Sequence, residues 1–230
     1  MMSNSEVSIV IPTRNESESI GRVIDEVHKV LSGWNYEILV IDTESTDGTV
    51  EIALSKGARV ESEPRRGYGR AYKTGFQKAT GKYVATLDAD LTYPADRIPE
   101  FLRLLESGID FISGDRLSEL DVKAMTGMHR IGNAILNTAF KLLYRYPIKD
   151  SQSGMWVFRK SLLEKLILLS DGMPFSEELK FSAVQGGFKF VEIPIKYRPR
   201  IGEKKLRSFS DAWMNLKYLF MRKFGWVKSS

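Results

Sequence analysis

The sequence predicts an α/β fold with a mostly parallel central sheet, and three observations lead to that prediction. Short apolar runs alternate with helical patterns through the first half of the chain. Acidic residues come directly after several of these runs, where ligands bind in parallel sheets. The composition, 43% hydrophobic and 27% charged over 230 residues, is that of an ordinary globular protein. Disordered, collagenous and disulfide-scaffold classes are therefore excluded.

The first strand and helix are predicted between residues 7 and 31. Residues Val7 to Ile11 form a β-branched run that Pro12 ends, as expected of a buried strand running into a loop. Apolar residues then recur at helical spacing from Ile20 to Leu31, and Gly33 follows as a stop signal.

The alternation continues through residue 87. Two of the three following strands are short apolar runs, at 37–41 and 83–87, and turn or cap residues precede the helices. These elements are a strand at 37–41, a helix at 50–56, a strand at 59–61, a helix at 71–79 and a strand at 83–87. Such an order favours a parallel sheet with ligands at the carboxyl ends of its strands.

Beyond about residue 114 strand signals are fewer, and two segments are apolar around much of a helix. No Ser/Gly-rich linker and no internal repeat separates the halves. One domain with an elaborated second half is the simplest interpretation.

Charge and composition limit the chemistry. The chain has 34 basic and 29 acidic residues, a net charge of +5, which favours anionic partners. It has no cysteine and two histidines, so a zinc site is improbable and any metal should be a hard cation bound by oxygen.

Three acidic loops follow predicted strands, at 15–16, 42–47 and 88–90. In the last of them, Asp88 and Asp90 place two carboxylates on one turn, which suits Mg²⁺ or Mn²⁺ and a diphosphate. An isolated D-x-D is more often a solvated turn, but an apolar strand directly before this one favours the functional interpretation.

A loop at 64–73 mixes cations, glycines and aromatic residues ahead of a helix. Its backbone amides are expected to meet phosphate. It is not a dinucleotide fingerprint, because the third glycine is missing and the loop does not follow the first strand.

Together these motifs resemble family-2 glycosyltransferases of the GT-A fold, and within them enzymes similar to dolichyl-phosphate mannose synthase and dolichyl-phosphate glucosyltransferase. The matching segments, in chain order, are 10–16, 40–42 with 45–49, 67–71, 88–91, 114–116, 150–154, 178–179 and 200–205. The resemblance implies a single GT-A domain with a Rossmann-like nucleotide-sugar-binding half (1–114) and an acceptor-binding half (115–230).

The resemblance also implies roles for individual residues. The donor, a GDP- or UDP-linked sugar, would contact Pro12, Arg14, Glu16, Asp42, Asp88, Ala89, Arg200 and Lys205. Asp88 and Asp90 would hold Mg²⁺ or Mn²⁺, Arg116 and Arg130 would face the acceptor phosphate, and the catalytic set would be Asp90, Asp115 and Arg116. One departure is Asp42-Thr43, where family members commonly have two aspartates. Because of this departure, the resemblance does not determine which nucleotide the donor carries.

The expected reaction is inverting transfer of a sugar to a polyprenyl phosphate, whose oxygen is already largely anionic near neutral pH. Two alternatives remain open: a soluble family-2 enzyme acting on a hydroxyl, with Asp115 as base, and a noncatalytic nucleotide-sugar-binding protein. Nucleic acid is not an expected partner, because an acidic crevice repels its backbone.

Two segments predict a peripheral position on the cytoplasmic face of a membrane. Residues 131–146 are apolar over a broad arc, and the last helix carries a stripe with cations beside it. That stripe comprises Phe209, Trp213, Leu216, Phe220 and Phe224. Packing in a core would give the same spacing.

Overall fold

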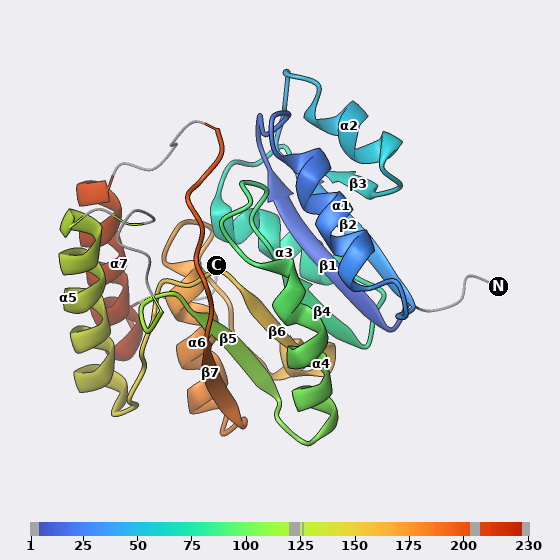
Figure 1. Ribbon diagram of the computed structural model, residues 1–230. Coiled ribbons are helices and arrows are strands. Elements are labelled where there is room, and N and C mark those ends of the chain that lie inside the picture. The colour runs from blue at the N-terminus through green and yellow to red at the C-terminus, as the bar shows by residue number, and fades with distance from the viewer. Residues whose placement is uncertain (1–4, 120–124, 126, 203–207, 227–230) are drawn as a thin grey trace.

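The computed structural model describes residues 5–119, 125, 127–202 and 208–226, with the side chains of 208–211 excepted. Within these residues, seven strands form one sheet in the order β3-β2-β1-β4-β6-β5-β7 (Figure 1). They are Val7–Thr13 (β1), Tyr36–Asp42 (β2), Arg59–Ser62 (β3), Tyr83–Thr86 (β4), Phe111–Asp115 (β5), Trp156–Arg159 (β6) and Phe190–Pro194 (β7).

The sheet is mostly parallel, as predicted. β1 pairs in parallel with β2 and β4, and β5 pairs in parallel with β7. The exception is β6, which is antiparallel to both of its neighbours, β4 and β5. The carboxyl ends of β1, β2, β4 and β5 therefore meet at one edge of the sheet.

Seven α-helices and two short 3-10 helices of the described chain connect the strands. The helices are Ile20–Val30 (α1), Thr49–Ser55 (α2), Tyr68–Lys78 (α3), Ile98–Glu106 (α4), Gly127–Tyr144 (α5), Phe175–Gln185 (α6) and Ser208–Lys223 (α7). The 3-10 helices are Ala95–Arg97 and Lys160–Lys165. α3 begins three residues before the predicted start, at Tyr68.

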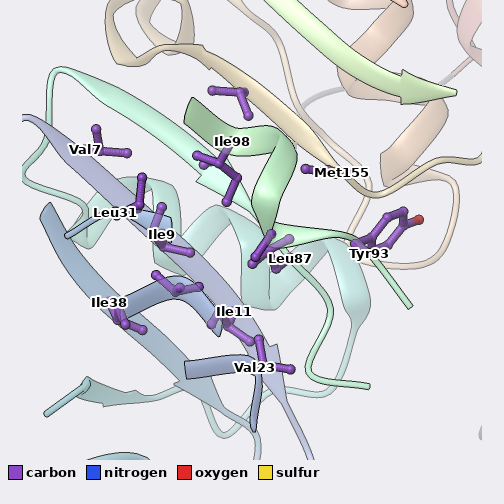
Figure 2. Packing of buried hydrophobic residues seen from close by; sticks show 14 of the residues in the cluster. Val7, Ile9, Ile11, Val23, Leu31, Ile38, Leu87, Tyr93, Ile98 and Met155 are labelled. Atoms are coloured by element: carbon purple, nitrogen blue, oxygen red, sulfur yellow. The ribbon is translucent and has the colours of Figure 1, made fainter. Parts of the chain in front are cut away.

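Two hydrophobic cores lie on the two faces of the sheet, because successive side chains of a strand point to opposite faces. On β2, Ile38 and Val40 pack with α1 and α4 in one core, whereas Leu39 and Ile41 pack in the other. Figure 2 shows the first core, in which Ile11 of β1 lies near Val23 of α1 and Ile9 lies near Leu31. The buried strands position the loops that follow them.

α5 and α7 lie side by side at one end of the molecule (Figure 1). Their inner faces are buried through Phe140 and Leu219, and the Tyr144 hydroxyl donates to the Leu219 carbonyl at 3.2 Å. Among the described residues, no helix combines the length and apolar character needed to cross a membrane.

Candidate active site

The carboxyl edge of the sheet brings together the predicted acidic loops. Arg200, from the segment after β7, pairs with Glu16 after β1 at 2.9 Å and with Asp90 after β4 at 3.1 Å. The guanidinium thus joins two loops separated by more than 70 residues in the sequence. The prediction that these loops converge is confirmed for Glu16 and Asp90.

Asp88 and Asp90 occupy different environments on the turn after β4. Asp90 is buried, and its Oδ1 accepts hydrogen bonds from the Thr92 amide at 3.1 Å and the Thr92 hydroxyl at 2.6 Å. Asp88 is half-buried and accepts a hydrogen bond from the Tyr72 hydroxyl at 3.2 Å. Burial, followed by the charge of Asp90, raises the pKa of Asp88 to about 7. A cation beside this pair would therefore be strongly favoured.

Residues 195–201 lie along the ends of the strands and deliver Arg200. Their backbone amides donate to the carbonyls of Asp115, Thr92 and Asp90, at 2.9, 2.9 and 3.1 Å. Arg198 fixes the segment to α1 through two 2.9 Å contacts with Glu26. The Nε atom of Arg200 is buried without a hydrogen-bond partner in the described part of the chain. A buried donor without a partner is costly, so this guanidinium has hydrogen-bonding capacity left to satisfy.

The predicted nucleoside residues lie at the ends of β1 and β2. Asp42 is buried, and its carboxylate accepts hydrogen bonds from the hydroxyls of Thr13 at 3.0 Å and Ser45 at 2.5 Å. It therefore shapes the loop after β2. Pro12 is half-buried in β1, and Arg14 is exposed in the loop that follows.

The glycine-containing segment at the start of α3 was expected to offer its backbone amides to phosphate, and two of these amides are used within the protein instead. The amides of Gly69 and Arg70 donate to the carbonyls of Gly172 and Asp171, at 3.3 and 3.0 Å. Gly67 is required here for space, because a Cβ atom would lie 2.3 Å from the Asp171 carbonyl oxygen. The turn is a packing contact with the segment before α6.

Arg116 is buried, and its guanidinium is paired in a fork. Its Nε and one terminal nitrogen contact the two carboxylate oxygens of Asp150 at 2.7 and 2.8 Å, and its amide donates to the same carboxylate at 3.0 Å. Asp150 is completely buried, and Arg116 holds the pKa of that carboxyl below its usual range despite burial. Arg116 is therefore committed to an ion pair within the protein.

Asp115 is completely buried at the end of β5. Its carboxylate accepts hydrogen bonds from the amides of Leu117 and Ser118, at 2.9 and 3.2 Å, and from the Ser118 hydroxyl. This is the geometry of a residue that caps the following turn.

Arg130 is exposed on α5 and lines a pocket of about 480 Å³. Ser118 and Lys141 line the same pocket, so the Asp115 turn and the cations of α5 face one space. A larger pocket of about 910 Å³ lies away from the acidic loops, where Lys82 precedes β4 and Lys160 follows β6. Of the remaining predicted residues, Ala89 is buried between Asp88 and Asp90, and Lys205 lies outside the described residues.

Several buried polar residues near the site were not assigned roles from the sequence. Tyr72 and Lys180 lie within helices. The spacing of apolar residues along a helix shows which face is buried and gives no sign that one residue belongs to a functional site. Asp150 and Glu178 lie in segments that match the family, and that match was the sequence feature that could have pointed to them. Glu177 is completely buried beside Gln152, and burial raises its pKa to about 8.

The acidic pair fits a metal that arrives with a diphosphate. Within the described chain, no group of three or more His, Cys, Asp or Glu side chains is arranged to hold a metal ion. Mg²⁺ in phosphate-handling enzymes is commonly held by one or two carboxylates, with phosphate oxygens and water completing its shell. Asp88 and Asp90 supply such a pair of hard oxygen ligands.

Comparison with known proteins gives a consistent picture. The model for glycosyl transferase family 2 matches residues 8–167. The dolichyl-phosphate hexose transferase of Haloferax volcanii is 33% identical over 205 residues, which cover 89% of this chain and 88% of that protein. The low-salt glycan biosynthesis hexosyltransferase Agl6 of the same organism is 35% identical over 228 residues, 97% of this chain. This chain spans only 55% of the length of Agl6.

Solved structures with the same architecture include glucosyl-3-phosphoglycerate synthase from Mycobacterium tuberculosis in complex with Mn²⁺, UDP and phosphoglyceric acid. It superposes with a TM-score of 0.79 at 20% identity, covering 98% of this chain and 80% of that one. This likeness shows the GT-A fold. The family model matches more than half of the chain, and the similarity to a hexose transferase covers 89% of it, so the chain belongs to glycosyl transferase family 2.

Proposed function

We propose that the protein transfers a sugar, with inversion, from a nucleoside diphosphate sugar to a polyprenyl phosphate. The main observation behind the proposal is the arrangement of Asp88, Asp90 and Arg200. It places two carboxylates and a cation together at the carboxyl edge of the sheet. The 33% identity with dolichyl-phosphate hexose transferase supports the acceptor class.

At the donor end, Asp88 and Asp90 would hold Mg²⁺ or Mn²⁺, and the solved synthase of the same fold contains Mn²⁺ together with UDP. The ion would neutralise charge on the departing diphosphate. Arg200 adds a second positive charge, and its unpartnered Nε atom gives the diphosphate a donor that Glu16 and Asp90 leave unused. Glu16, Asp42 and the loop after β1 would enclose the nucleoside.

At the acceptor end, the pocket beside α5 is the proposed position of the phosphate. Arg130 and Lys141 supply positive charge there. Arg116, in contrast, is paired with the buried carboxylate of Asp150. A phosphate monoester has a second pKa of about 6, so its oxygen is largely anionic at neutral pH. The transfer therefore needs orientation of the nucleophile and no strong base.

A hydroxyl acceptor is the second candidate, because the synthase of similar fold was solved with phosphoglyceric acid. Such an acceptor would require a carboxylate base. Asp115 is poorly placed for that role, since it is completely buried and caps its own turn. The buried state of Asp115 favours the phosphate acceptor.

Calorimetry with UDP and GDP, each titrated with and without Mn²⁺, tests the donor site. We expect tight binding only when nucleotide and metal are both present, because two carboxylates alone neither complete a metal shell nor attract a diphosphate. Weak binding is expected for Mn²⁺ alone. Equal nucleotide affinity in excess chelator would contradict the assignment of Asp88 and Asp90.

The α5 and α7 pair is the proposed membrane-facing surface. The exposed apolar residues of α5 lie at helical spacing, and further exposed apolar residues belong to the neighbouring helix α7 and the residues directly after it. They are Met128, Ile131, Ile135, Leu142, Trp213, Met214, Phe220, Phe224 and Trp226. Exposed Lys141, Lys217 and Lys223 supply cations for anionic headgroups. The side chain of Phe209, also predicted here, lies outside the described residues.

Co-sedimentation with vesicles tests this surface. We expect binding to increase with anionic lipid and decrease with salt, because screening weakens attraction between surface charges. Leu142→Ser should reduce binding, whereas Leu54→Ser, which removes another exposed leucine from α2 (55% exposed, against 75% for Leu142), should not. Equal partitioning of both variants and the parent protein would exclude α5 as the docking surface.

A further inference from the structure

Tyr72 of α3 is a buried tyrosine whose hydroxyl reaches the acidic pair. Its side chain is completely inaccessible to solvent, and the hydroxyl donates to the Oδ1 atom of Asp88 at 3.2 Å. The hydrogen-bonding partners of the two aspartates therefore differ. Asp90 is held by Thr92 and Arg200, whereas the hydrogen bond to Asp88 comes from a helix on one face of the sheet.

The ring of Tyr72 is held on several sides. It stacks on Phe175 of α6, with 6.0 Å between ring centroids and 4° between planes. Trp156 of β6 meets it edge-on at 5.0 Å, and Tyr68 meets it edge-on at 4.9 Å. Because three elements fix the ring, the hydroxyl has little freedom to move. The hydroxyl is therefore a fixed hydrogen-bond donor for the Asp88 carboxylate.

A fixed donor matters for Asp88 because the carboxylate of Asp90 repels it. The Asp90 carboxylate lies two residues away on the same turn, and two like charges this close in the sequence repel each other. The hydrogen bond from Tyr72 opposes this repulsion and limits the orientations that the Asp88 carboxylate can adopt. Groups that hydrogen-bond to metal-binding carboxylates orient them, and their removal commonly weakens metal affinity about 10- to 100-fold.

We propose that Tyr72 is a positioning residue for the donor site, which orients Asp88 so that both carboxylates meet one divalent cation and its diphosphate. The inference rests on the proposed function, since it assigns Tyr72 to the same metal-diphosphate site. Tyr72 would contact neither the metal nor the substrate. It acts through Asp88.

The test compares Tyr72→Phe with the parent protein by calorimetry, using UDP and GDP with and without Mn²⁺. The phenylalanine keeps the packed ring and removes only the hydroxyl. We expect the enhancement of nucleotide affinity by Mn²⁺ to decrease about tenfold or more, with the melting temperature nearly unchanged. Tyr83→Phe is the matched control, because Tyr83 is equally buried at the start of the strand that leads to Asp88.

A double-mutant cycle with Asp88→Asn shows whether the effect passes through Asp88. If it does, Tyr72→Phe should cause no further loss of metal enhancement in the Asp88→Asn background. Unchanged enhancement in Tyr72→Phe, or an equal loss in Tyr83→Phe, would overturn the inference. Absence of any Mn²⁺ enhancement in the parent protein would instead contradict the proposed donor site, so the two failures are distinguishable.

Discussion

Asp90→Asn is expected to abolish sugar transfer while leaving the fold intact. Asparagine keeps an oxygen that can accept from Thr92, but it removes the negative charge that faces Arg200 at 3.1 Å and would bind the cation. Loss of one preorganised electrostatic contact commonly lowers kcat about 10²- to 10³-fold, and loss of a metal ligand should cost at least that much. Product formation at saturating Mn²⁺ and donor is the measurement.

The matched control is Asp96→Asn. Asp96 lies a few residues further along, with its side chain 65% exposed and 3.7 Å from Arg198. The same chemical change there should leave turnover close to that of the parent protein. Turnover that survives in Asp90→Asn, or full activity of the parent protein in excess chelator, would contradict the role of the acidic pair.

The second large effect is expected for Arg116→Ala, and it concerns stability. Removing the guanidinium leaves the Asp150 carboxylate fully buried without its paired cation. Breaking a buried ion pair from one side typically costs about 3 to 5 kcal/mol. We therefore expect a clear decrease in the free energy of unfolding, measured by denaturant titration.

Arg130→Ala is the informative comparison. Arg130 is exposed, so its removal should change the free energy of unfolding by about 0.5 kcal/mol or less. It should instead raise the KM for the acceptor, because the pocket beside α5 loses one of its cations. Replacing Asp150 by Asn in the Arg116→Ala background should recover part of the lost stability. Equal stability of Arg116→Ala and Arg130→Ala would show that the fork with Asp150 contributes little.

The parallel half of the fold could be predicted because its signals are local. Val7–Ile11 and Glu37–Ile41 are apolar runs of strand length, and each is followed by a helical pattern and turn residues. The position of Asp88 and Asp90 at the end of a strand follows from the same pattern. Their convergence with Glu16 follows from the parallel topology.

The remaining features depend on contacts between distant residues. β6 has only four residues, and nothing in Trp156–Arg159 indicates that it inserts antiparallel between β4 and β5. The partner of Arg116 lies 34 residues away, so its burial in an ion pair could not be deduced from its neighbours in the sequence. The contact at the start of α3 could not be predicted for the same reason, since the segment that accepts from the amides of Gly69 and Arg70 lies about 100 residues further along.

The acceptor is the central claim, and a transfer assay tests it most directly. The protein is incubated with Mn²⁺, with UDP- and GDP-linked sugars in turn, and with polyprenyl phosphate in anionic vesicles beside 3-phosphoglycerate in solution. The account predicts a lipid-extractable glycosyl phosphate with inverted anomeric configuration, and no transfer to phosphoglycerate. Transfer to the soluble hydroxyl acceptor alone, with the polyprenyl phosphate unchanged, would contradict it.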